Sequence, residues 1–149
     1  SYIPEDKGEL IAYASVYGNT AEAAEKLAEA LREKGEKVVT ADLARCDMAE
    51  AIEDAFRYDR FVTASVTYDG GLFPVMESFL SHLKAKNYQN RTVAFIENGS
   101  WAPMSGKLMR SYFEGMKNIT ILDKVVTVKS AVKSDTIDEI KQLAEELVK

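Results

Sequence analysis

Apolar residues in this chain fall into short, nearly continuous runs separated by longer amphipathic stretches. Runs of five or six residues, rich in small and β-branched side chains, are typical of parallel strands that are covered on both faces. The strands predicted in this way are 9–14, 37–41, 61–66 and 92–96, with a fifth inside 119–128. The last of these runs is interrupted near Asp123.

Between these runs the apolar positions recur every three or four residues, which predicts helices. The predicted helices are 20–34, 48–56, 74–84, 103–116 and a last one beginning at Ser134 or Asp135 as N-cap. Gly35 follows the first helix, as expected for a left-handed helix end, and Pro74 suits a first helical turn. Five strands that alternate with five helices indicate one α/β domain with a parallel sheet.

The first eight residues show no periodicity and include Pro4 and Gly8. We interpret 1–8 as a leader or linker and 9–149 as the folded domain. A chain of 149 residues has the size of one ordinary domain.

Composition narrows the class of protein. Hydrophobic content of 46% and charged content of 29% are typical of a soluble globular protein, and no stretch resembles a membrane span or signal peptide. The single cysteine, Cys46, excludes an internal disulfide and favours a cytoplasmic location. The net charge of −5 argues against a nucleic-acid partner, and the single histidine, His82, argues against a histidine-rich metal centre.

Three loops that follow predicted strands carry unusual chemistry. In an open parallel sheet, ligands bind beyond the carboxyl ends of the strands, where the strand order reverses. The loops after the first, third and fourth strands meet there if the sheet order is 2-1-3-4-5, so we expect this order rather than the six-stranded dinucleotide-binding one. The candidate site residues are Ser15, Val16, Tyr17, Gly18, Asn19, Thr20; Thr67, Tyr68, Asp69, Gly70, Gly71; and Asn98, Gly99, Ser100, Trp101.

The first of these loops is a candidate phosphate site at a helix N-terminus. It matches neither the phosphate loop of ATP- and GTP-binding proteins nor the glycine pattern of dinucleotide sites, and 15–25 contains no lysine or arginine. The hydroxyls of Ser15 and Thr20, the Asn19 amide and backbone N–H groups near Gly18 could hold a terminal monophosphate. The alternative is a loop that only caps the helix.

The other two loops each place a large aromatic residue beside glycine. A planar heteroaromatic ring could stack between Tyr68 and Trp101, with loop N–H groups bonding its polar edge. The alternative for both side chains is that they are half-buried lids over the edge of the sheet.

In sequence, segments 15–20 (SVYGNT), 65–74 (SVTYDGGLFP) and 97–103 (ENGSWAP) resemble the three flavin-binding loops of the flavodoxin-like domain of flavodiiron proteins, or A-type flavoproteins. The resemblance implies a flavodoxin-like fold that binds FMN non-covalently: 15–20 would take the phosphate, and Tyr68 and Trp101 would flank the isoalloxazine. It also implies electron transfer to a diiron centre that reduces dioxygen or nitric oxide, on a preceding metallo-β-lactamase-like domain. A rubredoxin-like protein or a flavin reductase would be the electron donor.

Two positions depart from that family's pattern. Val66 stands where proline is frequent, and Asp69 where asparagine is frequent. A carboxylate at Asp69, if close to the flavin, would disfavour negative charge on the reduced ring and lower its potential. One histidine cannot supply a diiron centre, so we expect either an excised domain or a free-standing relative.

Two other functions remain open at this stage. The first is a stand-alone flavin reductase acting on quinone or a similar acceptor. The second is a non-flavin interaction module of the same fold. A phosphoacceptor receiver is disfavoured because Ala14 and Ser15 stand where acidic residues would be needed. The acidic residues of the first predicted helix are expected to form a solvated face, which could also steer a basic redox partner; they are Glu22, Glu25, Glu29 and Glu33.

Overall fold

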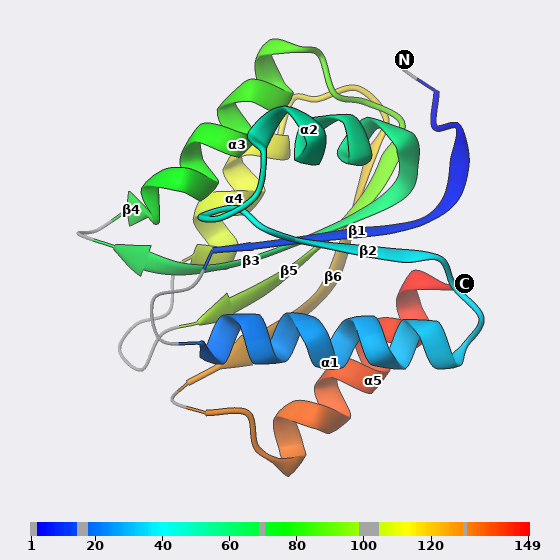
Figure 1. The fold of residues 1–149 in the computed structure, drawn as a ribbon, viewed down its shortest axis with the longest axis vertical. Coiled ribbons are helices and arrows are strands. Elements are labelled where there is room, and N and C mark those ends of the chain that lie inside the picture. Colours follow the sequence, from blue (N-terminus) through cyan, green and yellow to red (C-terminus); the bar gives the residue numbers. More distant parts are fainter. Residues whose placement is uncertain (1–2, 15–17, 69–70, 99–104, 130) are drawn as a thin grey trace.

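The computed structural model describes residues 3–14, 18–68, 71–98, 105–129 and 131–149. A parallel sheet forms the middle of three layers (Figure 1). Its strands are β1 Asp6–Ala14, β2 Val38–Asp42, β3 Tyr58–Tyr68, β5 Arg91–Asn98 and β6 Ile119–Val128. The order is β2-β1-β3-β5-β6, which confirms the predicted 2-1-3-4-5 arrangement of the five parallel strands.

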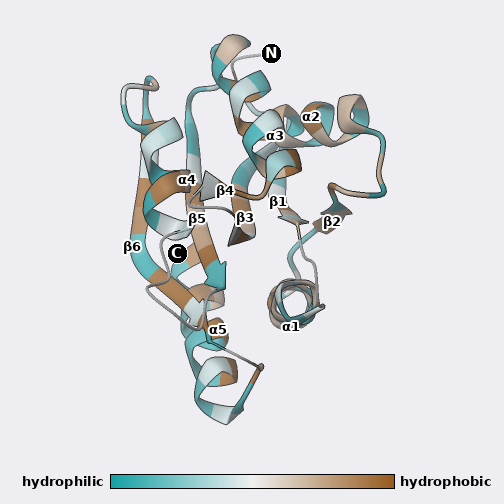
Figure 2. Ribbon diagram, turned by 90° about the vertical axis from the view of Figure 1, so that its left-hand side faces the viewer, coloured by the Kyte–Doolittle hydropathy of each residue, from teal (hydrophilic) through white to brown (hydrophobic). Residues whose placement is uncertain are grey.

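Helices cover both faces of the sheet, as predicted. They are α1 Asn19–Glu33, α2 Met48–Arg57, α3 Pro74–Ala85, α4 Ser105–Phe113 and α5 Ser134–Leu147. The first and last, α1 and α5, lie on one face, and α2, α3 and α4 lie on the other (Figures 1 and 2). This arrangement leaves the carboxyl ends of the strands as the edge at which the helices begin.

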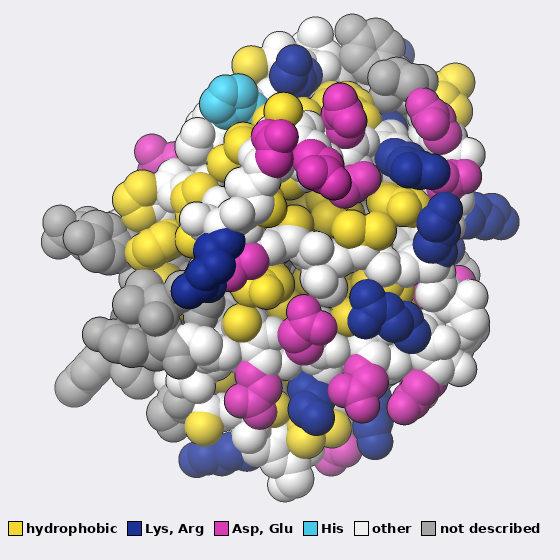
Figure 3. Space-filling view, viewed as in Figure 1, with side chains coloured by type: hydrophobic (Ala, Val, Ile, Leu, Met, Phe, Trp, Pro, Cys, Tyr) yellow, Lys and Arg dark blue, Asp and Glu magenta, His cyan; other side chains and the backbone are white. Residues whose placement is uncertain are grey.

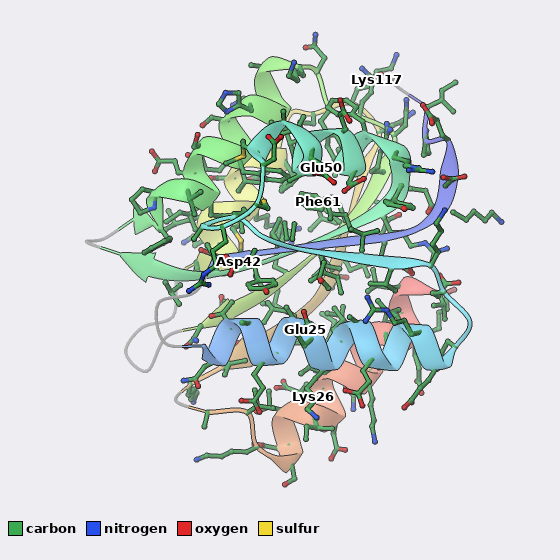
Figure 4. All side chains as sticks on the ribbon, viewed as in Figure 1. Glu25, Lys26, Asp42, Glu50, Phe61 and Lys117 are labelled. Carbon is green, nitrogen blue, oxygen red and sulfur yellow. The ribbon has the colours of Figure 1, made fainter. Side chains whose placement is uncertain are left out.

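Two hydrophobic cores of different character flank the sheet. Alternation along β3 sends Phe61 to the α2–α3–α4 face and Val62 to the α1–α5 face. On the first face Phe61 lies 5.6 Å from Phe79 and 6.2 Å from Phe113, measured between ring centroids, and points into the layer beneath α2 (Figure 4). On the other face the core is aliphatic, and Ala23, Ala24 and Ala28 of α1 are fully buried in it. Their size lets α1 pack close to the sheet.

The N-terminal boundaries of two strands differ from prediction. β1 begins at Asp6 instead of Glu9, so the last three residues of the predicted leader belong to the sheet. β3 begins at Tyr58 rather than Phe61. In both strands charged residues interrupt the apolar run, and ion pairing explains why they are tolerated there: Arg57 contacts Asp6, with Nε 2.8 Å from Oδ2.

A buried ionic cluster lies at the amino end of the sheet, remote from the candidate loops. Glu9 is fully buried, and Arg60 Nη1 donates to Glu9 Oε1 at 3.3 Å and to Glu36 Oε1 at 2.6 Å. The same Nη1 donates to the Leu147 carbonyl at the end of α5, at 2.7 Å. Burial, and after it a hydrogen bond with Glu36, raises the pKa of Glu9 to about 8. Glu9 therefore holds a proton to higher pH than an exposed glutamate does.

The helix ends mostly agree with prediction, but α4 ends at Phe113 and not at the predicted Met116. Lys34 is the C-cap of α1 and Gly35 has φ of 83°, and α3 begins at Pro74, so both of these predictions are confirmed. The N-cap of α5 is Lys133, so the assignment of Ser134 or Asp135 as N-cap was wrong. Asp135 Oδ1 still accepts a hydrogen bond from the Thr136 N–H, at 2.9 Å, inside the first turn.

Candidate functional site

The carboxyl ends of β1, β3 and β5 lie side by side at one edge of the sheet. Ala14 pairs in register with Ser65, and Ser65 pairs with Glu97. These are the strands that precede the three candidate loops, and α1 begins at the same edge (Figures 1 and 2). The topology therefore brings the described ends of the three loops together, as predicted.

The described part of the first loop leads directly into α1. Gly18 is the N-cap in a left-handed conformation, with φ of 88° and ψ of −15°, and its carbonyl accepts the Glu22 N–H at 2.8 Å. Asn19 begins the helix and is half-buried, whereas Thr20 is fully buried. The candidates Ser15, Val16 and Tyr17 lie outside the described residues.

A hydrogen bond joins the first loop to the end of β5. Asn98 Nδ2 donates to Thr20 Oγ1 at 3.0 Å, linking residues 78 positions apart. Asn98 is half-buried, and Thr20 faces the core between α1 and the sheet. Two predicted site residues from different loops are thus in direct contact. The remaining candidates of the Asn98 loop, Gly99, Ser100 and Trp101, lie outside the described residues.

The second candidate loop is more regular than predicted. Thr67 and Tyr68 are the last residues of β3. Their backbones pair antiparallel with a two-residue strand, β4 Gly71–Leu72. The Phe73 N–H continues this return by donating to the Val66 carbonyl at 3.3 Å. The prediction of a loop over 67–71 was therefore wrong for Thr67, Tyr68 and Gly71, because the chain folds back and pairs their backbone groups. Asp69 and Gly70 lie outside the described residues.

The predicted stacking of a ring between Tyr68 and Trp101 remains a prediction. Neither side chain belongs to the described part of the structure.

A cluster that the sequence analysis did not single out as a site lies behind these loops. Glu97 Oε1 accepts the backbone N–H of Gly106 at 3.2 Å, and its Oε2 accepts the Thr127 hydroxyl at 3.1 Å. The hydroxyl of Ser105, the first residue of α4, donates to the Ser65 carbonyl at 2.9 Å. The sequence pattern that could have indicated this cluster is an acidic residue at the end of an apolar strand, followed by a glycine near the start of the next helix.

The loop after β2 makes ordinary local contacts, as predicted. Asp42 lies at the end of β2 (Figure 4), where its Oδ2 is 2.6 Å from Arg45 Nη1. Asp47 caps α2 by accepting the Ala49 N–H at 2.9 Å. Burial, followed by the charge of Asp42, raises the pKa of the neighbouring Tyr13.

Other side chains with chemical potential lie at the surface. His82 is exposed on α3, and Cys46 is an exposed free thiol. The four glutamates of α1 are exposed, so the predicted solvated face is confirmed, and acidic side chains alternate with basic ones over this region (Figure 3). Among the residues that the structure places, no group of three or more His, Cys, Asp or Glu side chains could hold a metal ion. Within the same residues, no helix has the length and apolar character needed to cross a membrane.

A groove of about 1060 Å³ lies elsewhere, between α2 and α3. Its lining includes Met48, Ile52, Phe56, Arg57 and His82, and none of the predicted site residues. The groove therefore adds nothing to the candidate site.

Comparison with known proteins gives matches across nearly the whole chain. A family model described as a flavodoxin domain matches residues 10–137. An uncharacterized protein of Methanocaldococcus jannaschii is 25% identical over 142 residues, which cover 94% of this chain and 36% of that protein.

Solved structures share the fold. The rubredoxin oxygen:oxidoreductase of Desulfovibrio gigas aligns with a TM-score of 0.90 and 22% identity over 98% of this chain and 36% of its own. A flavo di-iron protein mutant from Thermotoga maritima aligns with a TM-score of 0.83 and 21% identity, over 98% of this chain and 36% of its own. Oxidised flavodoxin 1 from Bacillus cereus aligns with a TM-score of 0.81 and 20% identity, over 96% of this chain and 97% of its own.

The chain thus spans about a third of the length of three of these relatives and nearly the full length of a flavodoxin. The family model covers most of the chain, and the strand order and helix arrangement agree with it. This chain belongs to the flavodoxin domain family.

Proposed function

We propose that this chain binds FMN where β1, β3 and β5 end, and that the bound flavin carries electrons between a donor and an acceptor. The observation that carries the proposal is the hydrogen bond from Asn98 to Thr20, 3.0 Å long. It joins the loop predicted to hold the phosphate to the loop predicted to lie beside the flavin ring. Membership of the flavodoxin domain family supports the same cofactor.

The described residues of the first loop fit a terminal phosphate monoester. Thr20 offers a neutral hydroxyl in the first turn of α1, whose N-cap Gly18 has a left-handed backbone, and the Asn98 amide donates to that hydroxyl. No lysine or arginine occurs in 15–25. Backbone N–H groups at a helix start, together with neutral side-chain donors, suit one phosphate better than a triphosphate with its metal ion.

The proposed position of the cofactor separates the role of the flavin from that of the chain's residues. When bound, the flavin supplies the electron transfer. Residues 15–20, with the Thr20 hydroxyl, would hold the phosphate end, the β3–β4 turn would lie along one side of the ring, and 98–101 would lie along the other. The chain's residues bind and orient, and neither a general base nor a nucleophile is needed.

We further propose that the domain works within a longer protein of the flavodiiron kind. The supporting observation is that the chain spans 36% of both the rubredoxin oxygen:oxidoreductase and the Thermotoga flavo di-iron protein. In such a protein the domain would receive electrons from a rubredoxin-like protein or a flavin reductase. It would pass them to a diiron domain that reduces dioxygen or nitric oxide.

The test is titration of the purified protein with FMN, followed by flavin fluorescence and the visible spectrum. We expect quenching that saturates at one FMN per chain, with weaker binding of riboflavin because it lacks the phosphate. Unchanged fluorescence over the whole titration would refute the proposal. Rapid NADPH-dependent turnover of quinone by the FMN-loaded protein would instead favour the stand-alone reductase.

A further inference from the structure

The carboxylate of Glu97 ties the start of α4 to two strands of the sheet, directly behind the proposed cofactor site. We propose that Glu97 is a positioning residue, which fixes the first turn of α4 relative to the ends of β5 and β6 and thereby supports the affinity for the flavin ring. The affinity part of this proposal rests on the proposed function. The positioning part concerns contacts within the chain and can be tested without a flavin.

Three elements converge on Glu97. It is the penultimate residue of β5, and it pairs in register with Ser65 of β3 and Thr127 of β6. Its two carboxylate oxygens are used separately: Oε1 accepts from the Gly106 backbone at 3.2 Å, and Oε2 accepts from the Thr127 hydroxyl at 3.1 Å. A half-buried carboxylate held on both sides in this way has little freedom to move.

The helix start is shaped to admit this carboxylate. Gly106 is buried, and a Cβ atom built on it would lie 2.5 Å from Glu97 Oε1. Any larger residue at 106 would displace the carboxylate. The N-terminal end of a helix also favours a negative charge, so the position suits an acid.

A second bond holds the same helix start from the other side. The Ser105 hydroxyl donates to the Ser65 carbonyl at 2.9 Å, and both residues are fully buried. At the other end of the connecting segment, Asn98 is held by its bond to Thr20. The last residue of β5 and the first two residues of α4 are therefore each held by a hydrogen bond, and Glu97 accepts the one from Gly106.

The proposed binding position separates contacts with the phosphate from contacts with the flavin ring. Thr20 lies where the phosphate is proposed to bind, whereas Asn98 and the residues that follow it are proposed to lie beside the ring. Loss of the Glu97 anchor should weaken contacts with the ring, which FMN and riboflavin share. It should therefore weaken both ligands by the same factor.

The experiment compares three variants of the chain. Glu97→Ala removes both hydrogen bonds, and Glu97→Gln removes the charge but keeps one acceptor for Gly106 and one polar group for Thr127. Glu114→Gln removes the same charge from an exposed position after the other end of α4 and serves as control. Thermal unfolding and circular dichroism establish that each variant is folded.

The first readout uses the flavin-free protein. We expect amide hydrogen exchange to speed up in E97A over the first turn of α4, at Gly106 above all, and to stay near the wild-type rate in E97Q and E114Q. Wild-type exchange at this turn in a folded E97A would overturn the proposal, whether or not the protein binds flavin.

The second readout is the affinity for FMN and riboflavin. We expect E97A to weaken both by an equal factor of about 10, a size typical of lost supporting contacts around a site, and E97Q to stay within about twofold. A loss confined to FMN, or an equal loss in E97Q, would overturn the positioning role. If the wild-type chain binds neither ligand, the proposed function fails, and hydrogen exchange alone decides the role of Glu97.

Discussion

Asn98 donates from Nδ2 to the Thr20 hydroxyl at 3.0 Å, so the end of β5 and the first turn of α1 share one hydrogen bond across the edge of the sheet. Thr20 lies in α1, which follows β1, and Asn98 ends β5, with β3 between β1 and β5 in the sheet. Thr20 is proposed to lie at the phosphate end, so loss of its hydroxyl is expected to act mainly on the binding of the phosphate.

The first prediction concerns the proposed phosphate end. Thr20→Val keeps the shape of the buried side chain but removes the hydroxyl, so it leaves the Asn98 amide without this acceptor. We expect FMN to bind about 10-fold more weakly, as for loss of a hydrogen bond to a charged group. Riboflavin should be much less affected. Fluorescence titrations measure both affinities, with Thr40→Val, in β2, as a matched control. Equal losses for the two ligands would contradict the assignment of Thr20 to the phosphate.

The second prediction concerns Glu9 and the pH dependence of stability. The pKa of Glu9 is about 8 in the folded protein and its ordinary value is 4.5, so between these values the folded state binds one proton more than the unfolded state. Its contribution to stability is fully present below about pH 4.5 and is lost as pH rises towards 8. The slope from this one group is at most about 1.4 kcal/mol per pH unit.

Urea denaturation of the wild type and Glu9→Gln across this pH range checks this prediction. The variant keeps a neutral side chain in place, so its stability should fall less steeply between pH 5 and 8, an interval within the range set by the two pKa values. Parallel pH profiles for the two proteins would show that Glu9 titrates normally.

The third prediction concerns the aromatic core. Phe61→Ala empties a fully buried position that contacts Phe79 and Phe113, and should lower the free energy of unfolding by about 3–5 kcal/mol. Phe56→Ala removes a ring that is only half-buried at the end of α2 and should cost less. Denaturant unfolding measures both, and an equal or larger loss for Phe56→Ala would contradict this account of the core.

The fourth prediction concerns the close approach of Gly106 to Glu97. Alanine normally stabilises a helix interior relative to glycine by about 0.5–1 kcal/mol. At 106 the added Cβ would meet Glu97 Oε1 at 2.5 Å, so Gly106→Ala should destabilise the wild type instead.

In a chain that already carries Glu97→Ala, the same change should become neutral or stabilising. A double-mutant cycle by thermal unfolding measures this reversal. Additive effects of the two substitutions would show that the contact does not govern the site.

The fifth prediction follows from the resemblance to flavodiiron proteins. If the Asp69 carboxylate lies near the flavin, Asp69→Asn should raise the reduction potential of the FMN-loaded protein, because a fixed negative charge no longer opposes the added electrons. Spectroelectrochemical titration gives the potential, and an unchanged value would exclude Asp69 from the electrostatics of the flavin.

The sequence was sufficient for the arrangement of the elements. The continuous apolar run Phe61–Val66 indicates a strand buried on both faces, and the alanine-rich stripe of α1 indicates a helix buried on one face. These burial patterns were enough to predict the strands and helices. Three loops with glycine, hydroxyl and aromatic residues then indicated which edge carries the site. The family match and the strand order confirmed the fold.

Contacts between distant residues were not visible in the sequence. Asp6 and Arg60 lie in strands because ion pairs offset their charges, and those partners are 24 to 51 positions away. The β3–β4 pairing depends on a tight return that hydrophobic periodicity does not report. Glu97 was passed over because its role comes from Gly106 and Thr127, which only the folded sheet brings beside it.

The Glu97 carboxylate also decides which anions this edge of the sheet can accept. Glu97 accepts a backbone N–H at the start of α4, and Asp47 does the same at the start of α2. We therefore expect a phosphate to bind poorly at the starts of these two helices, because the chain's own carboxylates already accept from the backbone there. At α1 the N-cap is Gly18, which brings no side chain at all. The starts of α2 and α4 therefore already hold carboxylates of the chain, whereas the start of α1 has no side-chain cap.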